Sequence, residues 1–318
     1  MIICLYVDDM IFTGNNPGMF CDFKKAMTKE FEMTNIGEMS YFLGVEVKQM
    51  EEGIFMSQKK YAEEILSKFR MKDYKMVSTS IEPRMNLKAD SDKELINPTL
   101  FKSLVGILRY LTFTRPHIMF AVGLASRYID QPRQNHFSAA KRILRYIKGT
   151  VHHGLLFTHS KDSKLFGYSD SDYGGDTDDR RSTSRYAFHS GSAIFSWSSK
   201  KQQIVALSSC EAEYMFAVAC TCQAIWLKNI LNELHQEQEG PITVDKKSAI
   251  SLAKNPVFHS HSKHIETKHH FIWEQVKNKV VELFYCRTEE QLADIFTKPL
   301  KTDVLHKLKD MIGMQSRV

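Results

Sequence analysis

Four acidic residues in the second half of the chain have the side-chain type and spacing for metal-assisted hydrolysis of a phosphodiester. They are Asp170, Glu213, Asp245 and Asp294. Carboxylates packed together repel and partly protonate unless cations neutralise them, so such a grouping indicates a divalent-metal site. Mg²⁺ prefers oxygen ligands, and two ions about 4 Å apart can stabilise both the attacking and the leaving oxygen of the displacement. Each acid alone is more typical of a solvated strand end or helix start, so only the full set predicts chemistry.

Two of these carboxylates end short predicted strands. Residues Leu165–Asp170 form an apolar and aromatic run that stops at a carboxylate, and Ile242–Asp245 form a second such run. Residues 248–255, bounded by Pro256, then predict a helix. We expect the two strands to bring Asp170 and Asp245 to one corner of a sheet.

The other two carboxylates are expected early in helices. A Ser-x-x-Glu capping box from Ser208 places Glu213 in the first turns of the following helix, and a Thr-x-x-Gln spacing from Thr288 does the same for Asp294. The first of these helices has an apolar stripe that predicts its core-facing side: Tyr214, Ala217, Val218, Thr221 and Ile225. Both carboxylates can therefore flank a core without entering it.

A series of motifs around these residues resembles the reverse transcriptase and ribonuclease H portion of copia-type LTR retrotransposon Pol polyproteins. The motifs are Gly167-Tyr-Ser-Asp-Ser-Asp172, Asp179-Arg-Arg-Ser-Thr-Ser184, Ser196-Trp-Ser-Ser-Lys-Lys201, Ala206-Leu-Ser-Ser-Cys-Glu-Ala-Glu-Tyr214, Lys254-Asn-Pro-Val-Phe-His-Ser260, Lys263-His-Ile265 and Glu289-Glu-Gln-Leu-Ala-Asp-Ile-Phe-Thr-Lys-Pro-Leu300. The resemblance implies an α/β (α+β) fold. A ribonuclease H-like mixed sheet flanked by helices would follow a truncated reverse transcriptase palm and thumb and a helical connection.

The resemblance also implies an activity, with the family's four catalytic and metal-binding carboxylates falling on Asp170, Glu213, Asp245 and Asp294. The implied reaction is endonucleolytic hydrolysis of the RNA strand of an RNA–DNA hybrid with two Mg²⁺ ions, for which Mn²⁺ is a possible substitute. The implied partners are the hybrid and, if the chain is made as part of a longer one, the remainder of the Pol polyprotein. The alternative is a catalytically silent remnant that only binds nucleic acid.

Three departures from the family pattern bear on that alternative. Lys246 and Lys247 follow the third carboxylate where Asn-Gln is usual, so two positive charges stand beside a metal ligand. Arg185 replaces a Gly, in what is expected to be the turn between the first two strands, where a positive φ would strain it. Glu266 replaces an Asp and keeps the charge. None of these changes removes a proposed ligand.

The N-terminal Tyr6-Val-Asp-Asp9 resembles the polymerase centre of reverse transcriptases, with Asp8 and Asp9 in the metal-binding positions. Periodicity alone predicts a hairpin with a solvated acidic tip. Polymerase chemistry needs a third carboxylate and the nucleotide-binding fingers, which lie upstream in the family. We therefore expect a reverse transcriptase remnant that does not extend a primer.

We expect four segments along the chain: a palm and thumb remnant at 1–82, a helical thumb or connection region at 83–157, a ribonuclease H domain at 158–300 and a C-terminal helix or tail at 301–318. A length of 318 residues with 43% hydrophobic content suggests about two domains. The first segment should contain helices at 20–31 and 61–69 and a hairpin of 41–47 with 53–56. The linker is expected at 78–98, and helices at 101–128 and 137–147.

The net charge of +6 is unevenly distributed. Residues 101–150 hold nine Lys or Arg and one acid, whereas residues 170–179 hold five acids and no base. A basic surface for phosphates beside an acidic site for metals suits an enzyme that cleaves a polyanion. Arg142, Arg145 and Lys148 are the candidate nucleic-acid-binding residues, although a solvated basic face explains them equally well.

Other classes of function receive little support. The sequence contains no run long enough for a membrane span and no signal peptide, so we expect no membrane partner and an intracellular protein, cytoplasmic or nuclear and not secreted. The six cysteines form no CxxC pair, which predicts reduced thiols. The run from Asp170 to Arg181 imitates a calcium loop but lacks the closing Glu, and the histidines around 259–270 lack the cysteines of a zinc site.

Overall fold

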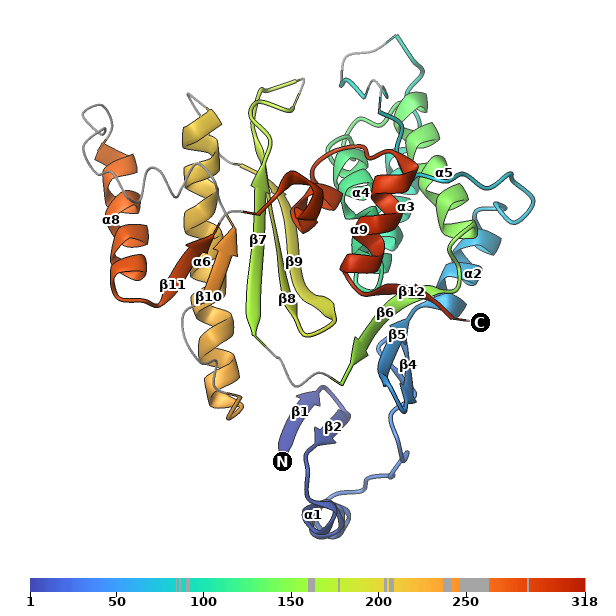
Figure 1. Ribbon diagram of the computed structural model, residues 1–318. Coiled ribbons are helices and arrows are strands. Elements are labelled where there is room, and N and C mark those ends of the chain that lie inside the picture. The colour runs from blue at the N-terminus through green and yellow to red at the C-terminus, as the bar shows by residue number, and fades with distance from the viewer. Residues whose placement is uncertain are drawn as a thin grey trace.

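The computed structural model describes residues 1–83, 85, 87–89, 92–159, 164–176, 178–202, 205, 209–236, 242–245, 263–284 and 286–317, with only the backbone course at 209–211, 213–215, 242–245, 263–269 and 288. Two five-stranded sheets and a helical layer make up most of it (Figure 1). The expected helix at 248–255 and the lysines at 246 and 247 lie outside the described residues.

The first sheet is mixed and has the strand order β11-β10-β7-β8-β9. Its strands are β7 (Leu165–Ser171), β8 (Thr183–Ser190), β9 (Ala193–Lys201), β10 (Ile242–Asp245) and β11 (Val281–Phe284). The first three form an antiparallel meander, while β10 runs parallel to both β7 and β11. This arrangement confirms the expected ribonuclease H-like mixed sheet, with predicted strands at 165–170 and 242–245.

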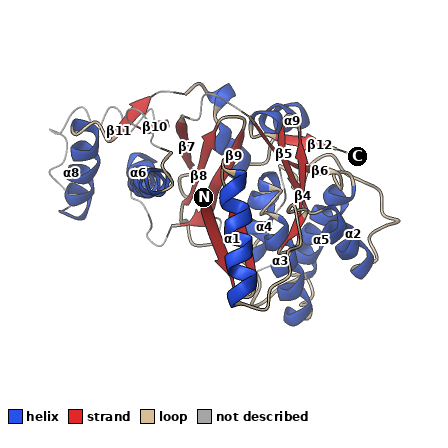
Figure 2. Ribbon diagram, turned by 90° about the horizontal axis from the view of Figure 1, so that it is seen from below, coloured by secondary structure: helices blue, strands red, loops and turns tan. Residues whose placement is uncertain are grey.

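Helices cover both faces of this sheet (Figure 2). On one face α6 (Ser209–Glu233) packs Phe216, Cys220 and Ala224 against Phe188 of β8. Gly167 lies beneath the Phe188 ring, and a Cβ added there would approach the ring to 2.8 Å, so a larger residue would push β7 and β8 apart. The helix α8 (Lys263–Lys277) packs against α6. Because α6 contacts both the sheet and α8, its buried face is wider than the predicted stripe.

The opposite face contacts a helical core. Its elements are α2 (Lys59–Lys68), α3 (Pro98–Leu111), η1 (Pro116–Ile118), α4 (Met119–Ser126), α5 (Gln134–Lys148), η4 (Leu292–Phe296) and α9 (Thr302–Met311). The helix α3 begins where the Asn97 side chain accepts hydrogen bonds from two backbone N–H groups and Pro98 sets the first turn. Ala187 of β8 and Ile194 of β9 belong to the same buried cluster as this helical layer. The described part of the expected linker at 78–98 also joins this layer, because Ile81 is buried in it, so these described residues do not form a free linker.

The second sheet is antiparallel and has the order β12-β6-β5-β4-β3. Its strands are β3 (Tyr41–Phe42), β4 (Val45–Met50), β5 (Gly53–Ser57), β6 (His153–Thr158) and β12 (Met314–Ser316). The prediction of one strand over 41–47 is wrong, because Leu43 and Gly44 have positive φ of 46° and 75° and turn the chain. This sheet joins strands from distant parts of the chain, so packing continues across the expected segment boundaries, and the division into domains stays a prediction.

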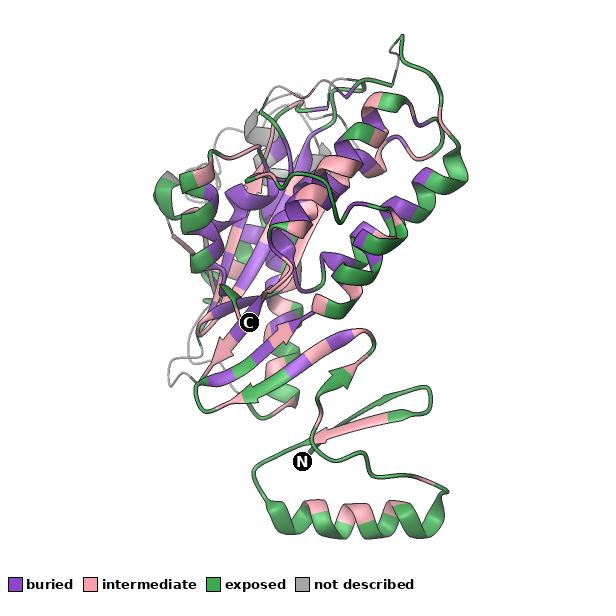
Figure 3. Ribbon diagram, turned by 90° about the vertical axis from the view of Figure 1, so that its right-hand side faces the viewer, coloured by how far each residue is buried: buried purple, intermediate pink, exposed green. Residues whose placement is uncertain are grey.

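The N-terminal elements lie apart from this core (Figures 1 and 3). They are the hairpin of β1 (Ile2–Tyr6) and β2 (Asp9–Thr13) and the helix α1 (Pro17–Glu30), as predicted. No residue from 1 to 30 is fully buried, and Leu5 is 66% exposed. Within the described residues, no helix is both long and apolar enough to span a membrane.

Candidate metal centre on the mixed sheet

Three of the four predicted carboxylates come from elements that end or begin at one end of the mixed sheet. Asp170 is the penultimate residue of β7, and Asp245 is the last residue of β10. The parallel pairing of Val244 with Gly167 places the end of β10 beside the middle of β7, two to three residues before Asp170. The start of α6, where Glu213 lies, is at the same end as the ends of β7 and β10 (Figure 1). The side chains of Glu213 and Asp245 lie outside the described residues.

Asp294 reaches this region from η4, which contacts β7. The prediction of an early α-helical turn is wrong in detail: Asp294 lies in the middle of a short 3₁₀ helix. Extended backbone at Gln291, with ψ of 95°, separates it from the preceding turn Thr288–Glu290. The Gln291 side chain caps η4 by accepting from the Ala293 N–H and also donates to the Ser169 carbonyl of β7 at 3.4 Å. Buried apolar residues on either side of Asp294 hold η4 in the core.

The Asp294 carboxyl is perturbed by its surroundings. It is 7% exposed, and its pKa is raised, first by burial and then by the negative charge of Asp170. A hydrogen bond from Lys298 and the charge of Arg185 act in the opposite direction. The Lys298 ammonium lies 2.6 Å from Asp294 Oδ2. The described part of the centre therefore consists of two carboxylates, Asp170 and Asp294. Asp294 is already paired with a cation, Lys298.

Arg185 does not lie in a turn, so the prediction of a strained turn residue is wrong. It belongs to β8, is directly opposite Asp170 in the antiparallel register, and has no positive φ. Cross-strand partners share a face of the sheet, so its side chain lies on the same face as that of Asp170. The guanidinium is fully buried, donates to Asp172 at 3.3 Å, and lies 5.2 Å from the centre of the Phe120 ring of α4. Positive φ in the loop before β8 occurs at Gly174 and at Arg180, with values of 59° and 58°.

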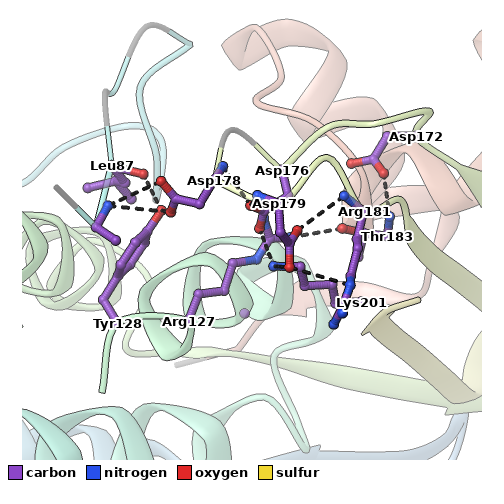
Figure 4. Close-up of polar contacts among 12 residues, drawn as sticks. Leu87, Arg127, Tyr128, Asp172, Asp176, Asp178, Asp179, Arg181, Thr183 and Lys201 are labelled. Carbon is purple, nitrogen blue, oxygen red and sulfur yellow. Dashed lines mark hydrogen bonds and ion pairs between the residues drawn. The ribbon is translucent and has the colours of Figure 1, made fainter. Parts of the chain in front are cut away.

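The acidic residues after Asp170 mostly form hydrogen bonds and ion pairs within the protein (Figure 4). Asp176 is 2% exposed and pairs with Arg127, just after α4, at 2.8 Å and with Lys201 of β9 at 2.7 Å. Burial alone would raise its pKa, but the hydrogen bond from Lys201, two backbone N–H groups and Arg127 lower it to about 2. Asp172 accepts from the Thr183 N–H, and Asp178 from the Tyr128 hydroxyl. The run therefore fastens the loop after β7 to the end of α4 and to β9.

The predicted donor set fits Mg²⁺, because it consists of carboxylate oxygens, and one of these carboxylates, Asp294, is already paired with a cation, Lys298. Among the described residues, no three His, Cys, Asp or Glu side chains gather as a metal-binding group. Of the four predicted ligands, only the side chains of Asp170 and Asp294 are described. Lys246 and Lys247, whose charges are expected to weaken metal binding, lie outside the described residues.

The candidate nucleic-acid-binding residues of α5 make intramolecular contacts. Arg142 pairs with Glu82, Arg145 donates to the Lys75 carbonyl at 2.7 Å, and Lys148 donates to the Tyr74 carbonyl at 2.8 Å. These bonds attach residues 74–82 to α5. A role in nucleic-acid binding stays a prediction for all three.

Asp8 and Asp9 lie at the β1–β2 turn and are exposed. The turn is tight, since Tyr6 pairs with Asp9 and Val7 has a φ of 50°. Their role as a reverse transcriptase remnant stays a prediction.

Several residues that shape the centre were not predicted from the sequence. Lys298 was detectable from its i+4 spacing to Asp294, which is typical of an ion pair on one helical face. The pairs of Asp176 with Arg127 and Lys201 carried no local signal, because their partners are separated by 49 and 25 positions along the chain.

Comparison with known proteins places these elements in a family. Residues 1–83 match the family "Reverse transcriptase (RNA-dependent DNA polymerase)". The chain is 38% identical over 312 residues to the retrovirus-related Pol polyprotein from transposon RE1 of Arabidopsis thaliana, covering 98% of this chain and 21% of that protein. It is 37% identical to the Pol polyprotein from transposon TNT 1-94 of Nicotiana tabacum, covering 99% of this chain and 24% of that protein. A putative Ty5-1 transposon protein of Saccharomyces cerevisiae is 31% identical, covering 68% of this chain and 71% of that protein.

Solved structures similar to this chain are more distant in sequence. The foamy viral protease-reverse transcriptase in complex with RNA/DNA hybrid is 14% identical, with a TM-score of 0.49 over 94% of this chain and 37% of that chain. LC11-RNase H1 in complex with RNA/DNA hybrid is 15% identical, with a TM-score of 0.31 over 41% of this chain and 91% of that chain.

The chain spans about a fifth of the length of the plant Pol polyproteins that it matches. The matches to these polyproteins run through almost the whole chain and therefore include the motifs from Gly167 to Leu300. The chain therefore belongs to the copia-type Pol polyprotein family of retrotransposons, in which it corresponds to a stretch running from the reverse transcriptase into a ribonuclease H-like domain.

Proposed function

We propose that the mixed-sheet domain hydrolyses the RNA strand of RNA–DNA hybrids endonucleolytically and depends on Mg²⁺. The observation that carries this proposal is that η4, which holds Asp294, packs against β7, which holds Asp170, although the two carboxylates are 124 positions apart. The charge of Asp170 also raises the pKa of Asp294. Such pairs are typical of sites where a cation neutralises them.

Asp170, Glu213, Asp245 and Asp294 would hold two Mg²⁺ ions, with Mn²⁺ as a possible substitute. When bound, the ions supply an activated water and stabilise charge on the leaving oxygen. The residues around the carboxylates hold them in place. Gln291 attaches η4 to β7, and the ion pair between Arg185 and Asp172 attaches β8 to the residues that follow Asp170. Because burial raises the pKa of Asp294 in the metal-free chain, a proton would compete with a metal ion for this carboxyl at a less acidic pH than at a solvated Asp.

The substrate and partners follow from family membership. The hybrid would be bound across the domain, and the remainder of a Pol polyprotein would be the protein partner if the chain is part of a longer one. The reaction would take place in the cytoplasm or nucleus.

A second candidate is a silent nucleic-acid-binding remnant. It is favoured by the two cations at the centre, since Lys298 forms an ion pair with Asp294 and Arg185 is the cross-strand partner of Asp170. Both would oppose a divalent ion electrostatically.

Cleavage of a labelled RNA strand annealed to DNA, with Mg²⁺ and with EDTA, tests the two candidates. We expect Asp170→Asn and Asp245→Asn each to lower the rate by at least about a hundredfold, because removal of even a residue that only supports a ligand costs about 10- to 100-fold. Asp73→Asn is the matched control, since Asp73 is exposed in the turn after α2. Thermal melting would check that all variants fold.

Wild-type cleavage that persists in EDTA, or in Asp170→Asn, would reject the metal centre. Hybrid binding without any cleavage by the wild type would support the silent remnant.

A further inference from the structure

The two cations at the candidate metal centre differ in how freely they can move. The Lys298 side chain is 50% exposed, so its ammonium can leave Asp294 for the solvent. The Arg185 side chain is fully buried and has no such route. A divalent ion that binds the carboxylates can therefore displace Lys298, but it binds with the guanidinium of Arg185 still in place.

Three contacts hold the Arg185 guanidinium. Its Nη2 donates to Asp172 Oδ2 at 3.3 Å, and its Nε donates to the Ser199 hydroxyl at 3.3 Å. The group also lies 5.2 Å from the centre of the Phe120 ring, within the range of a cation–π contact. Contacts from the end of β7, from β9 and from α4 thus fix its position.

The same guanidinium lies among the carboxylates of the centre. Arg185 is the cross-strand partner of Asp170, and such partners have Cβ atoms about 5 Å apart. Burial lowers the pKa of Arg185 to about 10, while the negative charges of Asp172 and Asp170 raise it, so the group is positive at neutral pH. Burial raises the pKa of Asp294, and the charge of Arg185 acts against this rise. One fixed cation therefore interacts with three carboxylates, two of which are predicted metal ligands.

We propose that Arg185 is a built-in counter-ion of the metal centre, which neutralises part of its negative charge without a metal and weakens the binding of divalent ions. Its Nη1 is buried and has no hydrogen-bond partner within the described part of the chain, so attraction to the carboxylates must offset the cost of burying this charge. Carboxylates that lie close together need a cation to stay ionised, and here the chain supplies one. This inference rests on the metal centre of the proposed function.

Binding of Mn²⁺ to the full chain without nucleic acid tests the proposal. Titration calorimetry measures the affinity, and the melting temperature measures the effect on stability. Two neutral variants, Arg185→Gln and Arg185→Met, remove the charge, and the flexible Met side chain suits the site beside Phe120. Arg185→Lys keeps the charge on a different side chain. Arg70→Gln is the matched control, because Arg70 is exposed just after α2.

We expect both neutral variants to bind Mn²⁺ at least about fivefold more tightly than the wild type, because the repulsion between a guanidinium and a divalent ion about 5 Å away is lost. They should melt at a lower temperature than the wild type in EDTA and gain more from Mn²⁺, since a ligand that binds more tightly stabilises the folded chain more. Arg185→Lys and Arg70→Gln should bind Mn²⁺ as the wild type does.

Addition of Asp170→Asn to the Arg185→Gln variant should abolish the gain in affinity, which would assign the bound ion to the centre. A gain that persists in this double variant would overturn the proposal, and so would equal Mn²⁺ affinity of the wild type and both neutral variants. Tight binding by Arg185→Lys would also overturn it, because side-chain size and not charge would then be the cause.

Hybrid cleavage is a separate measurement. A wild type that binds Mn²⁺ as expected but does not cleave the hybrid would reject the proposed function and leave the role of Arg185 intact.

Discussion

Single residues set the charge balance of the proposed metal centre. The Asp294 carboxylate has a raised pKa because it is buried near Asp170, yet the Lys298 ammonium partly compensates at 2.6 Å. A metal ion that uses the same oxygen must displace this ammonium. Lys298 is therefore expected to compete with Mg²⁺ and to control how much of it the centre needs.

We predict that Lys298→Ala lowers the Mg²⁺ concentration for half-maximal cleavage by roughly fivefold, which corresponds to about 1 kcal/mol between unit charges about 4 Å apart in water. A Mg²⁺ titration of the cleavage rate measures this. Lys301→Ala serves as control, because Lys301 is exposed just before α9. An unchanged or higher half-maximal concentration would mean that the ammonium does not compete with the metal.

The elements around the centre are held together by ion pairs as well as by apolar packing. The Asp176 carboxylate joins the loop after β7 to the end of α4 through Arg127 and to β9 through Lys201. The Asp176 side chain is 2% exposed, while those of Arg127 and Lys201 are 16% and 29% exposed. Removal of this carboxylate would take from Arg127 and Lys201 the anion that they share.

We predict that Asp176→Asn lowers the free energy of unfolding at pH 7 by about 2 kcal/mol, since its pKa is lowered to about 2 and each pKa unit corresponds to about 1.4 kcal/mol. A carboxyl with a lowered pKa stabilises the fold above its unfolded pKa, and this contribution is lost as the pH falls from about 4 towards 2. Urea unfolding at several pH values measures both effects. Asp73→Asn should behave as the wild type, and an equal effect of the two substitutions would show that the Asp176 pairs contribute nothing.

At the scale of the whole molecule, the second sheet joins distant parts of the chain, and a group of histidines and cations gathers around one of its strands, β6. His153 on β6 and His117 in η1 lie near Arg115 and near Lys309 of α9, with His152 and His306 also facing His153. Burial, followed by these positive charges, lowers the pKa of His153 to about 4 and keeps that of His117 well below its usual value. Both histidines are therefore neutral in the folded chain at neutral pH.

We predict that the fold loses on the order of 2 kcal/mol of stability through His153 as the pH falls from 6.5 to about 4. In this window the unfolded chain binds a proton that the folded chain does not, so stability decreases with decreasing pH. His153→Gln should flatten this part of the stability profile, whereas the exposed His270→Gln should leave it unchanged. Parallel profiles for the wild type and His153→Gln, measured by urea unfolding, would contradict the prediction.

Local patterns in the sequence were sufficient for two strands of the mixed sheet, for one of the helices that cover it and for the order of its motifs. Alternation and strand-ending carboxylates predicted β7 and β10, because these signals depend on neighbouring residues alone. The helix carrying Glu213 was likewise predicted from its capping signal and apolar periodicity. Family motifs added the identity of the four carboxylates.

Tertiary structure alone decided the contacts between distant segments. The sequence could not place Arg185 in a strand opposite Asp170, because register depends on pairing with another strand. It also could not pair Asp176 with Arg127, or bring β12 beside β6, since such contacts form only when the whole core packs. The residues that could carry the chemistry were thus visible locally, while their charges, burial and neighbouring cations were determined by long-range packing.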